Sequence, residues 1–236
     1  MSLLEVEALQ SHYGKSHILT GVDMRVDRGE IVAVLGRNGS GRSTMLKTLV
    51  GLVPPTSESV RLAGRELAGQ PPFRIARQGL GYVPEERLVF DDLTVEQNLL
   101  VGMQNGAEEA PAWQVSQMYA YFPALEARRH TRAGNLSGGE QQMLTLCRTL
   151  MTRPRVLLVD EPTEGLAPKI VENLVEVLGD IAQRGVAIVL VEQKMTVALR
   201  IAARCLVMGR GRIVFSGTPA ELTADRDIRR TWLEVA

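Results

Sequence analysis

One segment constrains this chain more than any other. An apolar, β-branched run at 31–35 leads directly into a glycine-rich stretch at 36–43, and an apolar helical pattern follows. Strand, glycine-rich loop and helix, in that order, form the context of a phosphate-binding loop. Glycines let backbone N–H groups wrap a polyphosphate, and the helix N-terminus adds unpaired donors and a positive dipole end. The predicted nucleotide-binding residues are Gly36, Arg37, Asn38, Gly39, Ser40, Gly41, Arg42, Ser43 and Thr44.

Two positions at the end of this loop have distinct expected roles. Ser43 follows the basic residue of the loop, so its hydroxyl is predicted to bind Mg²⁺. The basic residue itself is Arg42, where the pattern usually has lysine. A guanidinium is planar and bulkier than an ammonium, so it can hold phosphate charge without taking the place between the β- and γ-oxygens. This departure is compatible with nucleotide binding and slowed hydrolysis.

A pair of carboxylates follows another buried run, at 156–159. Asp160 and Glu161 stand at its end. Unpaired charges at the end of a buried strand are costly, so two adjacent acids there indicate a nearby cation or a proton-transfer task. Asp160 is predicted to orient Mg²⁺, and Glu161 to polarise the water that attacks a γ-phosphate. With the glycine-rich loop, this pair predicts a P-loop nucleotide hydrolase.

A third motif begins at Ser137. Ser137 and Glu140 have the spacing of a capping box, and apolar residues follow on one helical face. A well-capped helix is one sufficient explanation. The serine hydroxyl and the amides of Gly138 and Gly139 would also form a second anion site at a helix N-terminus. Two phosphate-directed ends, far apart in one chain, favour a dimer that closes one nucleotide between its subunits.

The remaining pattern predicts an α/β fold. Apolar runs at 31–35, 80–83, 156–159 and 186–191 are continuous, which is typical of strands buried on both faces. Between the last two runs, apolar residues recur at helical spacing, so the unit is strand, helix, strand, and the sheet is predicted to be parallel. Near the end of the chain, a hairpin is expected around the Gly-Arg-Gly turn at 209–211.

Between 86 and 151 the pattern changes to helices with polar connections. Thr94 to Gln97 has a capping-box spacing, and a second helix is expected over 113–122. The stretch 104–111 is expected to be a loop. This part of the chain is interpreted as a helical insertion in the α/β core.

Composition excludes several classes of protein. The chain has 236 residues, with 27 Lys plus Arg against 27 Asp plus Glu, and this neutrality argues against a dedicated nucleic-acid binder. Its apolar runs are far shorter than the roughly 18 residues that a spanning helix needs, and its first residues do not resemble an export signal. Cys147 and Cys205 are predicted to be small core residues. A cytosolic protein is expected.

Taken in order, these motifs resemble the ATP-binding subunits of ABC transporters over nearly the whole chain. Within that family, the segments at 81–85, 163–168 and 190–193 are most similar to the ATPases of bacterial branched-chain amino acid importers and their urea or amide relatives. The resemblance implies one domain, 1–236: a nucleotide-binding α/β core at 1–85 and 152–236 with a mostly parallel sheet and an N-terminal antiparallel β subdomain, and an inserted helical signature subdomain at 86–151.

The resemblance also assigns roles to single residues. Tyr13 matches the aromatic residue that stacks on adenine, and Glu85 stands where most relatives have a glutamine that contacts Mg²⁺. Gln193 stands where most members have a histidine that handles the γ-phosphate, and glutamine cannot become cationic as histidine can. Ser137, Gly138, Gly139 and Glu140 would form the signature loop, which reaches the ATP held by a partner subunit.

The expected function is ATP binding and hydrolysis coupled to branched-chain amino acid uptake, with ATP and Mg²⁺ bound. The expected partners are a homologous ATPase subunit, integral membrane permease subunits docked near 86–93 and, indirectly, a periplasmic solute-binding protein. The chain would then lie on the cytoplasmic face of the bacterial inner membrane. Because of Arg42 and Gln193, a heterodimer with a more complete second site is one hypothesis.

Three alternatives stay open at this point. One alternative is that the transported solute is urea or a short amide, because this chain does not contact the solute and its residues therefore do not identify it. A second alternative is that the chain is a nucleotide-binding subunit with little hydrolysis, because of Arg42. An ABC-type ATPase that acts on nucleic acid or ribosomes is disfavoured, because tandem cassettes or long coiled-coil insertions do not fit in 236 neutral residues.

Overall fold

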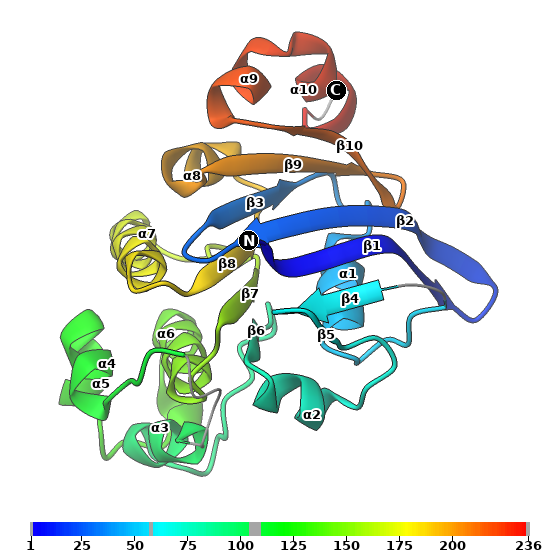
Figure 1. The fold of residues 1–236 in the computed structure, drawn as a ribbon. Helices are drawn as coiled ribbons and strands as arrows, with labels where there is room; N and C mark the ends of the chain where they lie inside the picture. Colours follow the sequence, from blue (N-terminus) through cyan, green and yellow to red (C-terminus); the bar gives the residue numbers. More distant parts are fainter. Residues whose placement is uncertain (1, 57–58, 104–109, 235–236) are drawn as a thin grey trace.

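Two β-sheets form the centre of the computed structural model, which describes residues 2–56, 59–103 and 110–234. One sheet has the strand order β2-β1-β4-β5 and the other β10-β9-β3-β8-β7-β6 (Figure 1). The first contains β1 (Ser2–Tyr13), β2 (Ser16–Asp27), β4 (Ser59–Leu62) and β5 (Arg65–Glu66). The second contains β3 (Ile31–Leu35), β6 (Leu80–Val83), β7 (Val156–Asp160), β8 (Ala187–Val191), β9 (Arg204–Gly209) and β10 (Arg212–Gly217).

The sheets differ in strand direction, as the predicted fold class requires. In the four-stranded sheet, β1 pairs antiparallel with both β2 and β4, and β4 pairs antiparallel with β5. In the six-stranded sheet, the pairs β9-β3, β3-β8, β8-β7 and β7-β6 are parallel, and β10 alone of the described strands there runs antiparallel to its neighbour. The predicted α/β fold with an N-terminal antiparallel part is confirmed.

The continuous apolar runs are explained by cores on both faces of the six-stranded sheet. In β3, Val32 and Val34 pack into the core between the two sheets, whereas Ala33 and Leu35 pack toward the C-terminal helices. Successive side chains of a strand point to opposite faces, so a strand covered on both sides must be apolar at every position.

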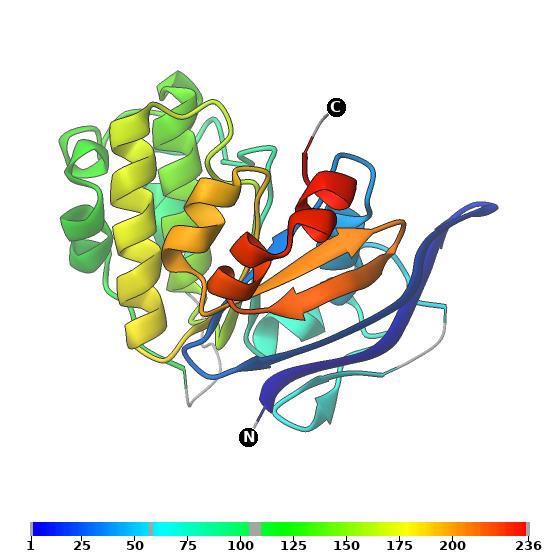
Figure 2. The same cartoon turned by 90° about the horizontal axis from the view of Figure 1, so that it is seen from above.

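Helices cover these sheets and form a separate group at one end. Figure 2 shows α6, α7 and α8 on the same side of the six-stranded sheet, and Figure 1 places α3 to α6 together at its lower end. The helices are α1 (Arg42–Leu49), α2 (Pro72–Arg77), α3 (Val95–Gly102), α4 (Val115–Tyr121), α5 (Pro123–Ala127), α6 (Gly138–Met151), α7 (Pro168–Gln183), α8 (Met195–Ile201), α9 (Pro219–Ala224) and α10 (Arg226–Trp232), with a 3₁₀ turn at Ala133–Asn135.

Several predicted elements change in extent. The helix expected over 113–122 is Val115–Tyr121, and the strand expected over 186–191 is Ala187–Val191. The capping boxes at Thr94 and Ser137 are confirmed. Residues 104–109 of the expected loop lie outside the described residues. Within the described part of 86–151 there is no strand, and the regular elements there are helices.

A search of the described helices for one with the length and apolar character of a membrane span finds none. Cys147 and Cys205 are both fully buried, as predicted.

Asn98 fixes the connection between β6 and α3. Its side chain is fully buried, and its oxygen accepts from the backbone N–H of Phe90 at 2.9 Å. Its amide nitrogen donates to the carbonyls of Phe90 and Thr94 at 3.1 and 3.0 Å. Arg148 on α6 donates to the same oxygen at 3.3 Å. One buried amide therefore satisfies the backbone of the turn that enters α3 and ties it to α6.

We expect Asn98→Ala to lower the free energy of unfolding by about 1–3 kcal/mol, because it leaves buried backbone groups without partners. Urea denaturation measures the change. Asn135→Ala, at an exposed asparagine, is the matched control and should be nearly neutral. Equal losses in the two variants would contradict the role of Asn98.

Candidate functional site

The carboxyl ends of three neighbouring parallel strands meet at one edge of the six-stranded sheet. Val34 of β3 and Asp160 of β7 are both paired with Val191 of β8, so the three strands end at the same level. Ligands of open α/β sheets bind at this edge, where the loops diverge. A cavity of about 290 Å³ lies there, lined by residues 38–44 of the glycine-rich loop together with Glu85, Glu161, Glu164 and Gln193.

Two glycines of the loop are required by its geometry. A Cβ on Gly36 would lie 2.6 Å from the carbonyl oxygen of Met208 and 2.7 Å from the hydroxyl of Ser40. Gly41, the N-cap of α1, has a φ of 105°, which L side chains rarely adopt. These two glycines therefore let the backbone pass close to Met208 and Ser40 and turn into α1.

Ser43 and Asp160 lie together beneath this cavity. The Ser43 hydroxyl donates to Oδ1 of Asp160 at 3.1 Å, and Tyr82 donates to Oδ2 at 3.3 Å. Burial raises the pKa of the Asp160 carboxyl, and the hydrogen bond from Ser43 opposes that shift. Oxygen ligands of this kind suit Mg²⁺, which prefers one or two carboxylates alongside phosphate oxygens. The donor set therefore fits the predicted metal.

Arg42 points at the protein's own groups. Its guanidinium is 4% exposed and donates to Oε1 of Glu161 at 2.8 Å, which makes a buried ion pair. The other terminal nitrogen donates to the backbone carbonyl of Glu192 at 2.8 Å, and a longer contact of 3.4 Å reaches the side chain of Asn38. The residue at the lysine position thus joins the end of β7 to the end of β8.

Glu161 is held from both sides. Its second oxygen accepts from the amide of Gln193 at 2.6 Å. Its backbone has a φ of 43°, an uncommon conformation for a residue other than glycine, and its N–H donates to the carbonyl of Val191 at 3.0 Å. Strained backbone of this kind clusters at functional sites. The structure thus brings together the two predicted catalytic residues.

Three carboxylates face one another on one side of the cavity. Glu85, Glu161 and Glu164 each place an oxygen within 4.8 Å of the others. Burial and the negative charges of Glu161 and Glu164 raise the pKa of Glu85. A cation in this part of the site would relieve the repulsion. Glu85, the third predicted metal ligand, therefore faces Glu161 and Glu164, and the negative charge of Asp160 is also close enough to raise its pKa.

The signature residues lie elsewhere. Ser137 and Glu140 cap α6 reciprocally, with Ser137 N–H to Glu140 at 2.8 Å and Glu140 N–H to Ser137 at 3.3 Å. These residues are not among those that line the cavity of the glycine-rich loop. Arg87 packs against Gly138 and donates to the backbone carbonyl of Glu164 at 2.7 Å. Within one chain, the signature and the glycine-rich loop therefore do not form a single site.

Tyr13 is half exposed at the end of β1 and is also outside the lining of that cavity. The predicted aromatic platform is thus accessible from solvent.

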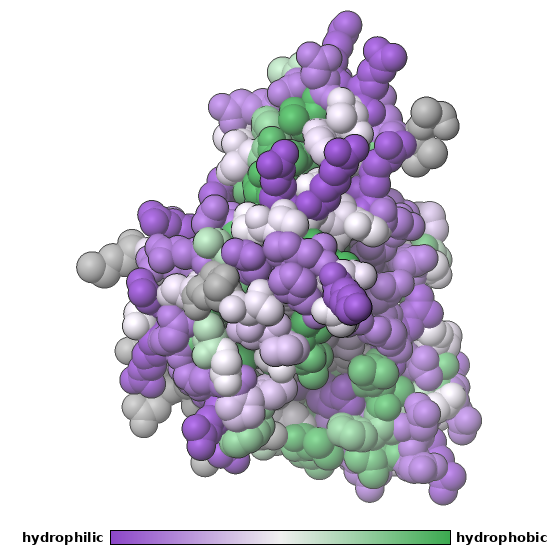
Figure 3. Space-filling view, turned by 90° about the vertical axis from the view of Figure 1, so that its right-hand side faces the viewer, coloured by the Kyte–Doolittle hydropathy of each residue, from purple (hydrophilic) through white to green (hydrophobic). Residues whose placement is uncertain are grey.

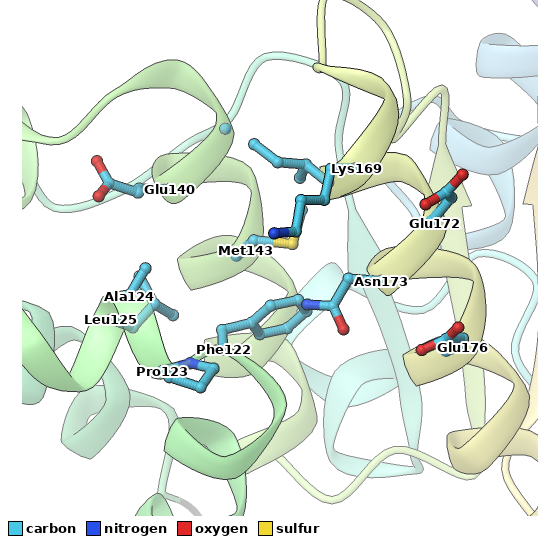
Figure 4. Close-up of a pocket in the computed structure, with 12 residues that line it drawn as sticks. Phe122, Pro123, Ala124, Leu125, Glu140, Met143, Lys169, Glu172, Asn173 and Glu176 are labelled. Carbon is cyan, nitrogen blue, oxygen red and sulfur yellow. The ribbon is translucent and has the colours of Figure 1, made fainter.

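A second cavity, of about 450 Å³, borders the signature end of α6. It lies between α5, α6 and α7, with Phe122 and Met143 on one side and Lys169 and Asn173 of α7 directed toward them (Figure 4). On the same α7, Asp180 accepts a hydrogen bond from Tyr121. The start of α6 therefore borders open space, while the end of α4 is held by direct bonds to α7.

Some residues of the site were not among the predicted ones. Glu164 and Tyr82 were noted only as parts of motifs, although Glu164 lines the cavity and Tyr82 contacts Asp160. Glu192 is buried and accepts from the N–H of Thr163 at 3.3 Å. Its position next to Gln193, at the end of a buried strand, was the available signal.

Comparison with known proteins decides the family. The ABC transporter family profile matches residues 19–164. The chain belongs to the ABC transporter family. It is 41% identical to the high-affinity branched-chain amino acid transport ATP-binding protein BraG of Pseudomonas aeruginosa, over 98% of this chain and 99% of that protein. As a member of this family the chain is an ABC-type ATPase, as predicted.

Other relatives widen the range of systems. The probable branched-chain amino acid transport ATP-binding protein LivF of Archaeoglobus fulgidus is 37% identical over 93% of this chain and 94% of its own length. The lipopolysaccharide export system ATP-binding protein LptB of Haemophilus influenzae is 28% identical over 99% and 98%. In fold, the chain matches a nucleotide-free ATP-binding cassette from an ABC transporter with a TM-score of 0.83, at 22% identity and covering 97% of both chains.

We expect Gly36→Ala to lower the free energy of unfolding by about 1–3 kcal/mol, because its Cβ would overlap Met208 and Ser40. Gly179→Ala is the matched control: it lies within α7, with open space at its Cβ, and should raise stability by about 0.5–1 kcal/mol. Thermal or urea denaturation gives both values. A neutral Gly36→Ala would show that the loop does not need this close approach.

Proposed function

We propose that this chain is the ATP-binding and ATP-hydrolysing subunit of an importer for branched-chain amino acids. The observation that carries the solute class is the 41% identity to BraG over almost the full length of both chains. The cavity at the strand ends supports the chemistry, because it combines a glycine-rich loop with buried carboxylates. Binding of ATP would close a dimer, and hydrolysis would reopen it.

The residues of the cavity would have different roles in the reaction. Gly36 to Thr44 would hold the phosphates through backbone N–H groups and the start of α1. Glu161 would take a proton from the attacking water, and Gln193 would orient Glu161 through their 2.6 Å hydrogen bond. Ser43, Asp160 and Glu85 would hold Mg²⁺, which neutralises charge on the phosphate oxygens when bound.

A second subunit would complete the site. Ser137, Gly138, Gly139 and Glu140 would meet the ATP of the partner, because they lie outside the cavity of their own chain. Tyr13 would stack on the adenine from its exposed position. We infer a heterodimer with a more complete second site, since Arg42 and Gln193 both depart from the usual pattern. Single-turnover hydrolysis as fast in this chain alone as in the mixed pair would contradict this.

An apolar surface offers a place for membrane subunits. Figure 3 shows hydrophobic residues gathered on the lower part of the face that it draws. A groove of about 360 Å³ lies between α2, α3 and α6, bordered by Leu52, Phe90 and Val101. Among the described residues, the exposed large hydrophobic side chains other than Tyr13 come from one stretch of sequence: Leu52, Phe73, Leu88, Phe90, Leu100, Val101 and Met103.

This surface supports the rest of the proposal. The permease subunits would dock next to 86–93, and the chain would lie on the cytoplasmic face of the inner membrane, served by a periplasmic solute-binding protein. Movement would pass from the core, 1–85 and 152–236, to the signature subdomain, 86–151. Such a large exposed apolar area on a protein surface usually marks an interaction site.

Glu161→Gln should reduce ATP hydrolysis by about 10²–10⁴-fold, because the amide cannot accept a proton, while nucleotide binding is retained. Phosphate release and equilibrium binding measure the two properties. Glu176→Gln, an exposed acid on α7, is the control and should keep the parent rate. Hydrolysis by Glu161→Gln at the parent rate would exclude Glu161 as the base.

Leu88→Ser combined with Phe90→Ser should weaken recovery of the membrane subunits by more than about tenfold, because each such side chain contributes about 1.5–3 kcal/mol when buried. Affinity purification from solubilised membranes measures recovery. Nucleotide binding by the isolated variant should equal that of the parent. Unchanged recovery would place the docking surface elsewhere.

Measuring the uptake of candidate solutes identifies the solute that the complex transports. The purified complex, reconstituted in vesicles with ATP inside, should accumulate leucine in competition with isoleucine and valine. Urea or acetamide uptake without leucine uptake would favour the amide importer. ATP binding without turnover in the assembled complex would favour a nucleotide-binding subunit.

A further inference from the structure

Arg42 extends beyond the glycine-rich loop and hydrogen-bonds to groups at the ends of two other strands, one of which is the proposed catalytic base. Its two terminal nitrogens donate to Glu161 and to the carbonyl of Glu192, both at 2.8 Å. Both partners belong to the protein. A phosphate that entered the loop would attract the same guanidinium, because its oxygens can replace a carboxylate as a bidentate anionic partner.

Glu161 is correspondingly occupied. One oxygen accepts from Arg42 at 2.8 Å and the other from Gln193 at 2.6 Å, and the side chain is 8% exposed. A general base must have a lone pair directed at the water whose proton it takes. In this arrangement the strongest partner of Glu161 is the buried cation.

We propose that Arg42 is a positioning residue that latches Glu161 while no nucleotide is bound, and that the incoming phosphate draws Arg42 away and so releases the base. The proposal rests on the proposed function. One side chain then links phosphate binding to activation of Glu161, and the site stays inactive until a polyphosphate supplies a better anionic partner for the guanidinium.

The arginine in place of lysine is what makes this link possible. Its planar fork bonds Glu161 at the end of β7 and Glu192 at the end of β8 at the same time. A lysine ammonium is a point charge on a flexible stem and has no such fork. Arginine in place of lysine at position 42 thus controls when Glu161 is available as a base, in addition to changing the contact with phosphate.

The latch predicts a measurable coupling. Breaking the Arg42–Glu161 ion pair costs free energy when nucleotide binds. A substitution at Glu161 that prevents the pair from forming should therefore tighten nucleotide binding. We expect Glu161→Gln to lower the Kd for Mg²⁺ with adenylyl-imidodiphosphate, an ATP analogue that is not hydrolysed, by about tenfold, within the usual range of site coupling. In the Arg42→Met background the same change should tighten binding less than in the parent, because it removes only the negative charge of Glu161 and there is no ion pair to open.

Glu164→Gln separates the latch from simple charge repulsion. Glu164 lines the same cavity and carries the same charge, and among the described residues its side chain makes no hydrogen bond or ion pair with Arg42. Its effect, which reports charge repulsion without the latch, should be the same in the Arg42 and Arg42→Met backgrounds and smaller than that of Glu161→Gln in the parent. Equal tightening by Glu161→Gln in both backgrounds, or tightening by Glu164→Gln in the parent as large as that by Glu161→Gln, would overturn the latch.

A second variant is used if Arg42→Met does not fold. If Arg42→Met is unfolded by circular dichroism, Arg42→Lys takes its place, and the tightening by Glu161→Gln should still be smaller than in the parent. Failure of the parent to bind the analogue at all would instead contradict the proposed function.

Discussion

The parallel pairing of β3, β8 and β7 is the constraint on which the rest of the site depends. Because Val34, Val191 and Asp160 lie in register, the loops after these strands must leave the sheet together. This alignment places the glycine-rich loop, the Asp160–Glu161 pair and Gln193 around one cavity, although more than 150 residues of sequence separate the first from the last. Cores on both faces hold the strands in that register.

The charged groups at this edge are organised by burial. Arg42 and Glu161 are both nearly inaccessible, and such ions are tolerated in the interior only when they are paired and hydrogen-bonded. The pair therefore has to be exchanged for another ionic partner, rather than simply broken, when the site binds an anion. This gives the cavity two arrangements of the same charges, which is the physical basis for coupling binding to chemistry.

The two ends of the helical group differ in their contacts with the core. At α4, Tyr121 bonds Asp180, and Arg184 stacks on Trp113 with its cation 5.1 Å from the ring centre. At the signature end, α6 borders a cavity of about 450 Å³. The proposed movement of the signature loop toward a partner subunit is compatible with the bonds at α4. Phe90, Leu100 and Val101 of the apolar surface belong to the same part of the chain, whereas Leu52 and Phe73 lie outside it.

Local patterns in the sequence were sufficient for the parallel α/β core, the glycine-rich loop, the carboxylates at 160 and 161 and the capping boxes at 94 and 137, because each depends on neighbouring residues and on side-chain periodicity. The N-terminal antiparallel sheet was expected only from the family resemblance. Contacts across the fold could not be read in this way. The bonds of Arg42 to Glu161 and Glu192, of Tyr82 to Asp160 and of Asn98 to the turn before α3 join residues whose proximity is set by strand register and helix packing. The sequence by itself determined which chemical groups this protein has, and only the tertiary structure decided which of them meet, because charge pairing depends on distance and burial.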